Sequence, residues 1–202
     1  MPVVYGDILS GNCYKIALLF SQLGIVHEWR SVDLTLGETR TDAFLKLNAA
    51  GQIPVVILDD ETVLTQSNAI LHYFAEGTPL LPSDKLDKAR VLEWQFFEQY
   101  SHEPNIAVRR FIRKYLNMPA ERQAEFDAKE TGSYRALQVM ENRLTDNDFL
   151  VGEHYSIADI SLYAYTHVAD EADLDLESYP GIRRWLRTVS AQSGYIGMRA
   201  DV

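Results

Sequence analysis

The first 33 residues pass from a strand to a helix and back to a strand, and this return constrains the fold more than any other feature. Val3 to Tyr5 form a β-branched and aromatic run that is typical of a buried strand. Apolar side chains recur at helical spacing from Ile16 to Leu23, and Gly24 then provides a common helix stop. His27 to Asp33 alternates loosely and indicates a second strand. The helix between the two strands implies a crossover, which predicts that the strands pair in parallel.

Residues 35–76 are predicted to complete a small mixed sheet. After a short helical piece that ends at Gly51, residues 52–58 give a strong strand signal with Pro54 at the entrance, where a residue without an N–H is tolerated. The Ile53–Pro54 bond is a candidate for the cis isomer. A brief strand over residues 62–64 follows as a hairpin partner, and a further helix follows Gln66. The order β-α-β-α-β-β-α predicts a thioredoxin-like α/β domain over residues 1–76.

The pattern changes after a segment with two prolines and a glycine, residues 77–84. We assign residues 77–85 to a linker. Residues 86–202 contain no convincing strand and show repeated helical spacing, which predicts an all-α C-terminal domain. Within this domain, Ser156 and Asp159 have the spacing of a capping box, in which each side chain holds a backbone N–H at the start of a helix. We interpret this pair as a folding signal.

Charge and cysteine content restrict the class of function. The net charge of −10 argues against a nucleic-acid surface, which needs a concentrated basic footprint. The one locally basic run, residues 109–114, is interpreted as a solvated helix face. A single cysteine allows no internal disulfide and favours a reducing, cytoplasmic location. Neither a secretion signal nor an apolar run of membrane-spanning length is found, so no membrane association is expected.

Residues 7–15 place a hydroxyl, an amide and a thiol in the first strand-to-helix turn. A helix N-terminus favours an anion, and a thiolate is one such anion. On this stretch alone, Ser10 either caps the helix or donates a hydrogen bond to a ligand. Cys13 is either a reactive thiolate or a small buried apolar residue, and we favour the buried interpretation.

Four segments together resemble the glutathione transferase superfamily, and they span essentially the whole chain. Residues 7–15 look like the first strand-to-helix turn of theta-like and nu-like bacterial members. Residues 51–55 resemble the cis-proline segment of the family, residues 66–70 its Glu/Gln-Ser step, and residues 152–159 the capping motif of its helical domain. The resemblance implies the glutathione transferase fold, with glutathione as a co-substrate and with neither a resident cofactor nor a metal.

The resemblance also implies which residues meet the glutathione sulfur. In the nu-like members a Ser or Thr and an Asn contact the sulfur at the positions of Ser10 and Asn12. Ser10 is expected to donate a hydrogen bond to the thiolate and not to act as a nucleophile. Asn12 is expected to orient the sulfur or to share its contact. Tyr5 lies inside the first strand, so no tyrosine matches the hydroxyl of the alpha, mu and pi classes.

The remaining predicted site residues hold the peptide and the second substrate. The backbone of the cis-proline segment pairs with the cysteinyl part in the family, and the Glu/Gln-Ser step binds the γ-glutamyl end. Close members carry His where this chain has Thr39, so Arg40 is the expected substitute for binding the glycyl carboxylate. The substrate-binding residues implied in this way are Arg40, Gln52, Ile53, Pro54, Gln66 and Ser67, with Tyr100 expected beside the second substrate, between the domains.

Two reactions and one non-catalytic role are compatible with such a site. Attack of the thiolate on a small electrophile gives a transferase with a role in detoxification. Attack on a disulfide gives a glutathione-dependent reductase, as the nu-like match of Asn12 suggests. The third alternative is a glutathione transferase fold that serves only as a binding module. A homodimer is what the resemblance implies in each case, while the second substrate stays unidentified.

Overall fold

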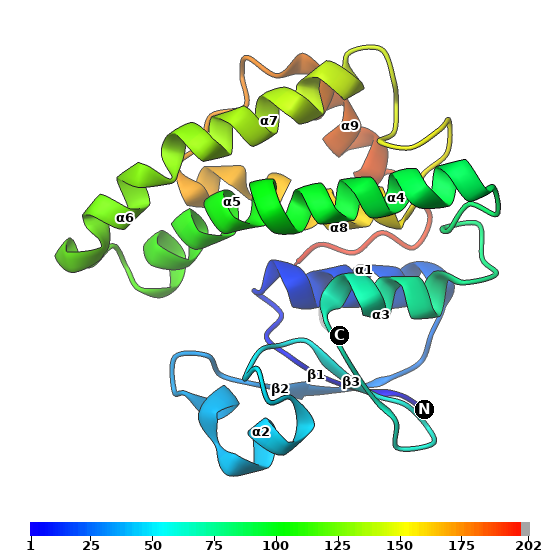
Figure 1. Ribbon diagram of the computed structural model, residues 1–202, viewed down its shortest axis with the longest axis vertical. Coiled ribbons are helices and arrows are strands. Elements are labelled where there is room, and N and C mark those ends of the chain that lie inside the picture. Colours follow the sequence, from blue (N-terminus) through cyan, green and yellow to red (C-terminus); the bar gives the residue numbers. More distant parts are fainter. Residues whose placement is uncertain (199–202) are drawn as a thin grey trace. The chain divides into compact units, whose positions relative to one another are not determined.

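The computed structural model describes residues 1–198 and consists of two compact units. Unit 1 contains residues 1–76 and the C-terminal segment that begins at Ser193, and unit 2 contains residues 77–192. Unit 1 is a small sheet with helices on its two faces, whereas unit 2 consists of helices and loops, with no strand among its described residues (Figure 1). The predicted α/β thioredoxin-like domain followed by an all-α domain is therefore confirmed as the fold class.

The sheet of unit 1 has four strands in the order β2-β1-β3-β4. The predicted parallel pairing is confirmed, because β1 (Val3–Gly6) runs parallel to β2 (Glu28–Ser31). On its other side β1 pairs antiparallel with β3 (Val55–Ile57), which forms the predicted hairpin with β4 (Val63–Thr65). The sheet is therefore mixed.

Three helices cover the sheet of unit 1. Helices α1 (Gly11–Leu23) and α3 (Ser67–Ala75) pack against each other on one face, and α2 (Asp42–Leu47) lies on the opposite face (Figure 1). Helix α1 is buried almost throughout and ends at Gly24, whose φ of 65° is a left-handed value that glycine adopts easily. The apolar stripe predicted from the sequence thus forms the centre of this unit.

The C-terminal segment of unit 1 packs on α1. The Tyr14 hydroxyl donates to the carbonyl of Ile196 at 2.7 Å, and the Ser21 hydroxyl donates to the carbonyl of Gly194 at 2.8 Å. Gly194 lies so close to the Gln22 backbone that a Cβ there would sit 2.8 Å from the Gln22 Cα. The predicted helical domain extended to residue 202, whereas residues 193–198 belong to unit 1, and residues 199–202 lie outside the described residues.

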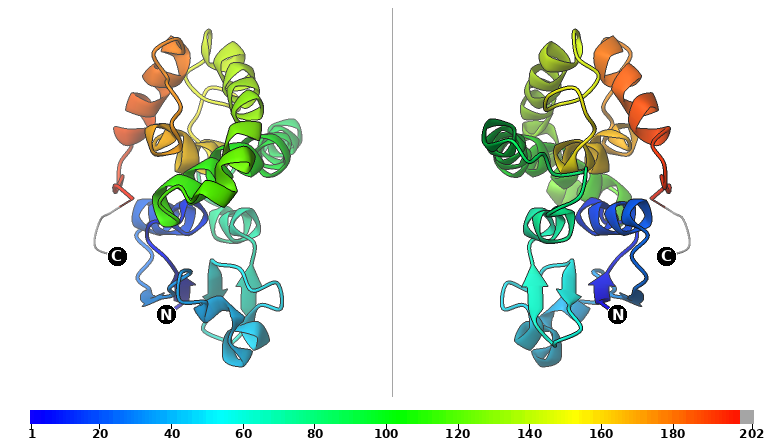
Figure 2. Two further views of the ribbon diagram at one scale, coloured as in Figure 1. Left: turned by 90° about the vertical axis from the view of Figure 1, so that its left-hand side faces the viewer. Right: turned by 90° about the vertical axis from the view of Figure 1, so that its right-hand side faces the viewer.

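Unit 2 is built from helices joined by short irregular segments. Helix α8 is buried along its whole length and packs on both α4 and α9, between which it lies in Figure 2. Two wider, π-helical turns follow α4 and α5, at Glu98–His102 and Phe111–Tyr115. The helices are α4 (Lys85–Phe97), α5 (Glu103–Arg110), α6 (Gln123–Ala128), α7 (Glu130–Leu144), α8 (Ile157–Thr166) and α9 (Pro180–Ser190). Among residues 1–198, none of the helices has the length and apolar character needed to cross a bilayer.

The predicted capping box at the start of α8 is confirmed, and it also serves tertiary structure. The Ser156 hydroxyl accepts from the Ala158 N–H, and the Asp159 carboxylate accepts from the Ser156 N–H at 2.9 Å. The other carboxylate oxygen of Asp159 accepts from the Trp185 indole at 2.9 Å and from the Leu150 N–H at 3.0 Å. Asp159 therefore joins α8 to α9 and to the preceding loop, which a local motif does not reveal.

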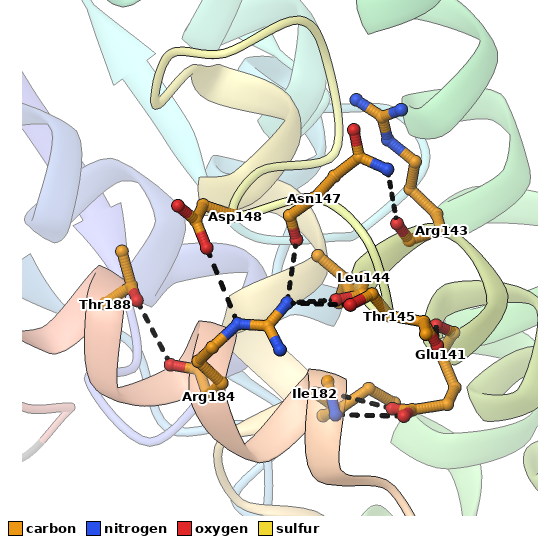
Figure 3. Close-up of polar contacts among 10 residues, drawn as sticks. Glu141, Arg143, Leu144, Thr145, Asn147, Asp148, Ile182, Arg184 and Thr188 are labelled. Atoms are coloured by element: carbon orange, nitrogen blue, oxygen red, sulfur yellow. Dashed lines mark hydrogen bonds and ion pairs between the residues drawn. The ribbon is translucent and has the colours of Figure 1, made fainter.

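A second buried carboxylate joins α7 to α9. Both oxygens of Glu141 accept backbone N–H groups in the first turn of α9, from Gly181 and Ile182, each at 2.9 Å (Figure 3). In the opposite direction, the Arg184 guanidinium donates to the carbonyl of Leu144 at the end of α7. The N-terminus of α9 thus receives a negative charge and the C-terminus of α7 a positive one, the arrangement that helix dipoles favour.

The prediction that the basic run at residues 109–114 forms a solvated helix face is wrong for its first two residues. Arg109 and Arg110 are each only 2% exposed. Arg109 donates to two backbone carbonyls and stacks 3.8 Å from the ring centroid of Phe126, while Arg110 pairs with Glu171 at 2.7 Å. Of the basic side chains in this run, those of Arg113 and Lys114 are solvated. Burial of Arg109 and Arg110 is possible because their side chains have long apolar stems and because backbone carbonyls accept from Arg109 and the Glu171 carboxylate from Arg110.

Candidate functional site

The first strand-to-helix turn is shaped by Asp7. Its carboxylate accepts from the Leu9 N–H at 2.9 Å, and its carbonyl accepts from the Ser10 N–H at 2.9 Å. Ser10 is the N-cap residue of α1, but its side chain makes no capping hydrogen bond. The capping interpretation of Ser10 is therefore wrong, and its hydroxyl lies instead within hydrogen-bonding reach of the Cys13 thiol.

Cys13 is buried completely, as predicted, and does not provide a reactive thiolate. Burial raises the pKa of its thiol to about 12, against the smaller lowering effects of the Ser10 hydroxyl and the Asp7 backbone. A thiol with this pKa stays protonated at neutral pH. Cys13 instead fills the narrow space behind β1, since a Cβ on Gly6 would lie 3.0 Å from its sulfur.

Asn12 and Ser67 are brought together although they are 55 positions apart in the sequence. The Ser67 hydroxyl donates to the Asn12 side-chain carbonyl oxygen, Oδ1, at 2.9 Å. The Lys15 ammonium donates to the same oxygen at 2.8 Å and lies 3.4 Å from the Ser67 hydroxyl. We name Asn12, Lys15 and Ser67 the Lys15 cluster. Lys15 was not predicted as a site residue, although its spacing of three from Asn12 places both on one face of α1.

The cis-proline segment is held by a second asparagine. The Ile53–Pro54 bond is cis, as predicted. The Asn48 side chain donates to the carbonyl of Gln52 at 2.7 Å and accepts from the Ala50 N–H at 3.1 Å. Asn48 thereby fixes the backbone just before the cis bond. This role of Asn48 was not predicted, although an asparagine side chain that bonds the backbone two residues further on is a common feature of turns.

Arg40 lies against this same turn. Its guanidinium donates to the carbonyl of Ala50 at 3.4 Å, and it packs so close to Gly51 that any Cβ at that position would clash with it. Gly51 also has a φ of +62°, a conformation that side chains rarely adopt. A positive charge is therefore placed beside the exposed Gln52.

Gln66 and Ser67 form the start of α3. Gln66 has a φ of 68° and a ψ of 109°, an unusual backbone conformation for a residue other than glycine. Ser67 follows as the first residue of α3, where backbone N–H groups have no acceptor within a helix. Strained residues of this kind cluster at ligand sites, so the segment supports a binding role.

Most of the predicted site residues lie in unit 1, and hydrogen bonds join some of them into groups. Asn12 and Ser67 form one group, Arg40 and the 50–52 turn form another, and Ser10 lies on the turn that precedes Asn12. Tyr100 belongs to unit 2, is 81% exposed, and stays a prediction. Within the described part of the chain, no group of three or more His, Cys, Asp and Glu side chains is placed to hold a metal ion.

Comparison with known proteins identifies the class. The family "Glutathione S-transferase, N-terminal domain" matches residues 9–76, and "Glutathione S-transferase, C-terminal domain" matches residues 102–193. A solved glutathione S-transferase from Pseudomonas fluorescens is 52% identical, with a TM-score of 0.96 over 98% of this chain and 99% of that one. Glutathione S-transferase 3 of Zea mays is 30% identical over 95% of this chain and 90% of its own length. The chain therefore belongs to the glutathione S-transferase family.

Other relatives carry the name URE2. The URE2 protein of Eremothecium gossypii is 28% identical over 87% of this chain, which spans 61% of the length of that protein. A structure of Ure2p in complex with glutathione is 22% identical, with a TM-score of 0.83 over 96% of this chain and 90% of that one. The relative from Saccharomyces cerevisiae is named a transcriptional regulator. The family thus includes proteins that are not named as enzymes.

Proposed function

We propose that the protein binds glutathione in unit 1 and transfers its thiolate to a small electrophile. The observation that carries this proposal is the hydrogen bond between Asn12 and Ser67. The family resemblance assigns Asn12 to the sulfur and Ser67 to the γ-glutamyl end of glutathione, and their contact supports a single site for both parts of the peptide. The glutathione complex of Ure2p supports the same ligand for this fold.

The peptide would be held by complementary charge and backbone pairing. Gln66, Ser67 and the first turn of α3 suit the γ-glutamyl end, since a helix N-terminus favours a carboxylate. The backbone of Gln52 and Ile53, fixed by Asn48, suits the cysteinyl part. Arg40 beside this turn suits the glycyl carboxylate, because a guanidinium matches carboxylate geometry.

Activation of the thiol is the chemical task of Ser10. A free thiol has a pKa near 8.5, so only a few per cent is ionised at pH 7. Lowering that pKa by about two units requires about 2.7 kcal/mol of preferential thiolate stabilisation. One charge-assisted hydrogen bond contributes about 1.5–3 kcal/mol. We expect Ser10, which makes no capping bond, to donate it in place of its hydrogen bond with the Cys13 thiol.

In the reaction, the glutathione thiol gives its proton to solvent and the thiolate attacks an electrophilic carbon of the second substrate. A carbon–sulfur bond forms, and the leaving group departs with its electron pair. Cys13 does not compete as a nucleophile in this proposal, because the pKa of its buried thiol is raised to about 12. Ser10 stays a donor throughout and forms no covalent bond.

A disulfide reductase is the second candidate, and Asn12 favours it because the nu-like members place an asparagine at this position. There the glutathione thiolate attacks a sulfur of the substrate disulfide and releases a thiolate. A second glutathione then releases the other substrate thiol and leaves oxidised glutathione. The URE2 relatives keep a third role open, in which the site binds glutathione without turnover.

We further propose that the protein is a homodimer. Leu92, Phe96 and Tyr100 follow one another at i, i+4 and i+8 along α4 and its π turn, and they are 42%, 60% and 81% exposed. We name them the α4 stripe. An apolar row of this kind on a single copy favours burial against another protein surface. A second copy of the chain is the partner that the family resemblance implies.

We place the activity in the cytoplasm, with detoxification as its setting. The support is the single cysteine, which is buried and forms no disulfide among the described residues. A chain of this kind suits a reducing compartment in which glutathione is mostly in its thiol form.

Calorimetric titration with reduced and then oxidised glutathione tests the proposal. Preferential binding of the reduced form supports the transferase, and tighter binding of the oxidised form supports the reductase. We expect Arg40→Ala to weaken binding about tenfold, the loss of roughly 1.4 kcal/mol from a carboxylate contact. Arg187→Ala is the matched control, because Arg187 is exposed on α9 of unit 2. A protein that binds neither reduced nor oxidised glutathione would overturn the proposal.

A further inference from the structure

Lys15 is a charged residue of α1 without solvent exposure. Its ammonium lies 2.8 Å from Oδ1 of Asn12 and 3.4 Å from the Ser67 hydroxyl oxygen. Burying an ammonium is costly unless oxygens surround it, because the charge loses its hydration. A residue that only filled space on α1 would be apolar, as its neighbours Ile16 and Ala17 are.

The chemistry of the ammonium fixes the orientation of the Asn12 amide. An ammonium has three donors and no acceptor, so the atom of Asn12 that faces Lys15 must be the carbonyl oxygen. The Ser67 hydroxyl donates to this same oxygen at 2.9 Å and so reinforces the orientation. The amide nitrogen of Asn12, Nδ2, is consequently turned away from Lys15. Without Lys15, a rotation of the amide that exchanges oxygen and nitrogen would be much less restricted.

We propose that Lys15 is a positioning residue that makes Asn12 present its amide nitrogen, and not its oxygen, to the glutathione sulfur. This inference rests on the proposed function, in which Asn12 meets the sulfur. A thiolate is stabilised by a donor and repelled by a carbonyl oxygen, so the orientation of the amide decides whether Asn12 helps or opposes ionisation. Lys15 touches neither end of the substrate in this arrangement and acts through Asn12.

The contact between Lys15 and Ser67 also connects Lys15 to the part of the site that would bind the γ-glutamyl end of glutathione. The hydrogen of the Ser67 hydroxyl is directed to Asn12, and Lys15 lies beside its oxygen. The start of α3 is thereby tied to the start of α1 around one buried charge. We therefore expect loss of Lys15 to disturb thiolate formation first, through Asn12, and peptide affinity second, through Ser67.

The test measures the pKa of the bound thiol from the ultraviolet absorbance of the thiolate as a function of pH. Lys15→Met removes the charge with little change in length, and Lys15→Arg keeps the donors. We expect Lys15→Met to raise the pKa of bound glutathione by about one unit, a tenfold loss in the thiolate equilibrium. Lys15→Arg should return the pKa most of the way to the wild-type value. Binding of S-methylglutathione, which has no ionisable thiol, reports whether the variant site is intact.

A merely structural role for Lys15 predicts a different result. Lys15→Met would then lower the melting temperature, while the thiol bound to the folded protein would keep the wild-type pKa. That result would overturn the inference and leave the proposed function standing. A wild-type protein that does not bind glutathione at all would overturn the proposed function, and the inference with it.

Because Lys15→Met can fail to fold, a second measurement uses the wild-type protein. In nitrogen-15 spectra, the side-chain amide signals of Asn12 are identified by their absence in Asn12→Ala. If Nδ2 faces the sulfur, these signals shift when reduced glutathione at high pH replaces S-methylglutathione. Signals that stay unchanged between the two ligands would overturn the inference.

Discussion

At the scale of single residues, the site depends on side chains that support others. Lys15 and Ser67 hold the amide of Asn12, and Asn48 holds the backbone on both sides of Gly51. Support of this kind matters because a displacement of about 1 Å in a reacting group can cost about a hundredfold in rate. The residues that meet glutathione in our proposal are therefore only part of what the site requires.

Ser10→Ala tests the role of the hydroxyl directly. We expect turnover to fall about 10- to 100-fold, the loss of one hydrogen bond to a thiolate, while the affinity for glutathione changes little. Steady-state kinetics with a chromogenic electrophile and calorimetry measure the two quantities. Ser10→Thr keeps a hydroxyl and should retain activity, and Ser83→Ala, at an exposed position of unit 2, is the control. Turnover of Ser10→Ala at the wild-type rate would contradict the mechanism.

At the scale of elements, buried carboxylates at helix ends hold unit 2 together. Asp159 caps α8 and binds the Trp185 indole of α9, while Glu141 of α7 accepts both N–H groups at the start of α9. Each carboxylate accepts hydrogen bonds at both oxygens. These hydrogen bonds reduce the cost of burying a carboxylate, and a negative charge at a helix N-terminus also interacts favourably with the helix dipole.

Substitution of Glu141 should therefore destabilise unit 2 strongly. Glu141→Ala leaves the Gly181 and Ile182 N–H groups without an acceptor, and we expect a loss of about 1–3 kcal/mol in the free energy of unfolding. Glu141→Gln keeps one acceptor and should lose less. Urea denaturation followed by circular dichroism measures both variants. Asn142→Ala, at the exposed neighbouring position, should stay within about 0.5 kcal/mol of the wild type. Equal losses for the alanine variants at positions 141 and 142 would refute the assignment.

Two buried groups near α8 give opposite pH dependences. Burial raises the pKa of Asp159 from 3.8 to about 6, so the folded state keeps the proton of this carboxyl group to a higher pH than the unfolded state does. The free energy of unfolding therefore falls as the pH rises from about 4 to 6. Burial lowers the pKa of His167 from 6.5 to about 4, so the folded state resists protonation and stability rises with pH from about 4 to 6.5. The two contributions oppose each other over pH 4–6.

Single substitutions should expose each contribution. Asp159→Asn should make the free energy of unfolding rise more steeply with pH between 4 and 6 than in the wild type, because only the His167 contribution is left of the two. His167→Gln should change the slope in the opposite sense. Urea denaturation at a series of pH values measures these slopes, which are insensitive to a constant loss of stability. Curves parallel to that of the wild type would show that neither group titrates as described.

At the scale of the whole molecule, periodicity predicted the elements well because each depends on residues close in sequence. The strand-helix-strand start determined the parallel pairing of β1 and β2, and Ser156 with Asp159 marked the start of α8. What the sequence did not reveal are contacts between distant residues. Lys15 meets Ser67 across 52 positions, and Arg109 meets the Ala172 carbonyl across 63. No local pattern distinguishes such a buried charge from a solvated one.

The oligomeric state is the last prediction, and it concerns the α4 stripe. Phe96 stands in the middle of this stripe and is 60% exposed in a single copy. If a second copy covers the stripe, Phe96→Asp places a charge in the interface and should convert the dimer to a monomer in light scattering at micromolar concentration. Val26→Asp is the control, because Val26 is also exposed but lies in unit 1, outside the stripe, and this variant should stay dimeric.

The same variant separates assembly from binding. Lys15, Asn12, Ser67 and Arg40 all belong to unit 1 of one chain, so monomeric Phe96→Asp should still bind glutathione. A wild-type protein that is already monomeric would refute the dimer and leave the glutathione site untouched. Loss of glutathione binding together with loss of the dimer would show instead that the site depends on the partner copy. The two measurements on one variant thus decide whether the glutathione site is complete within a single chain.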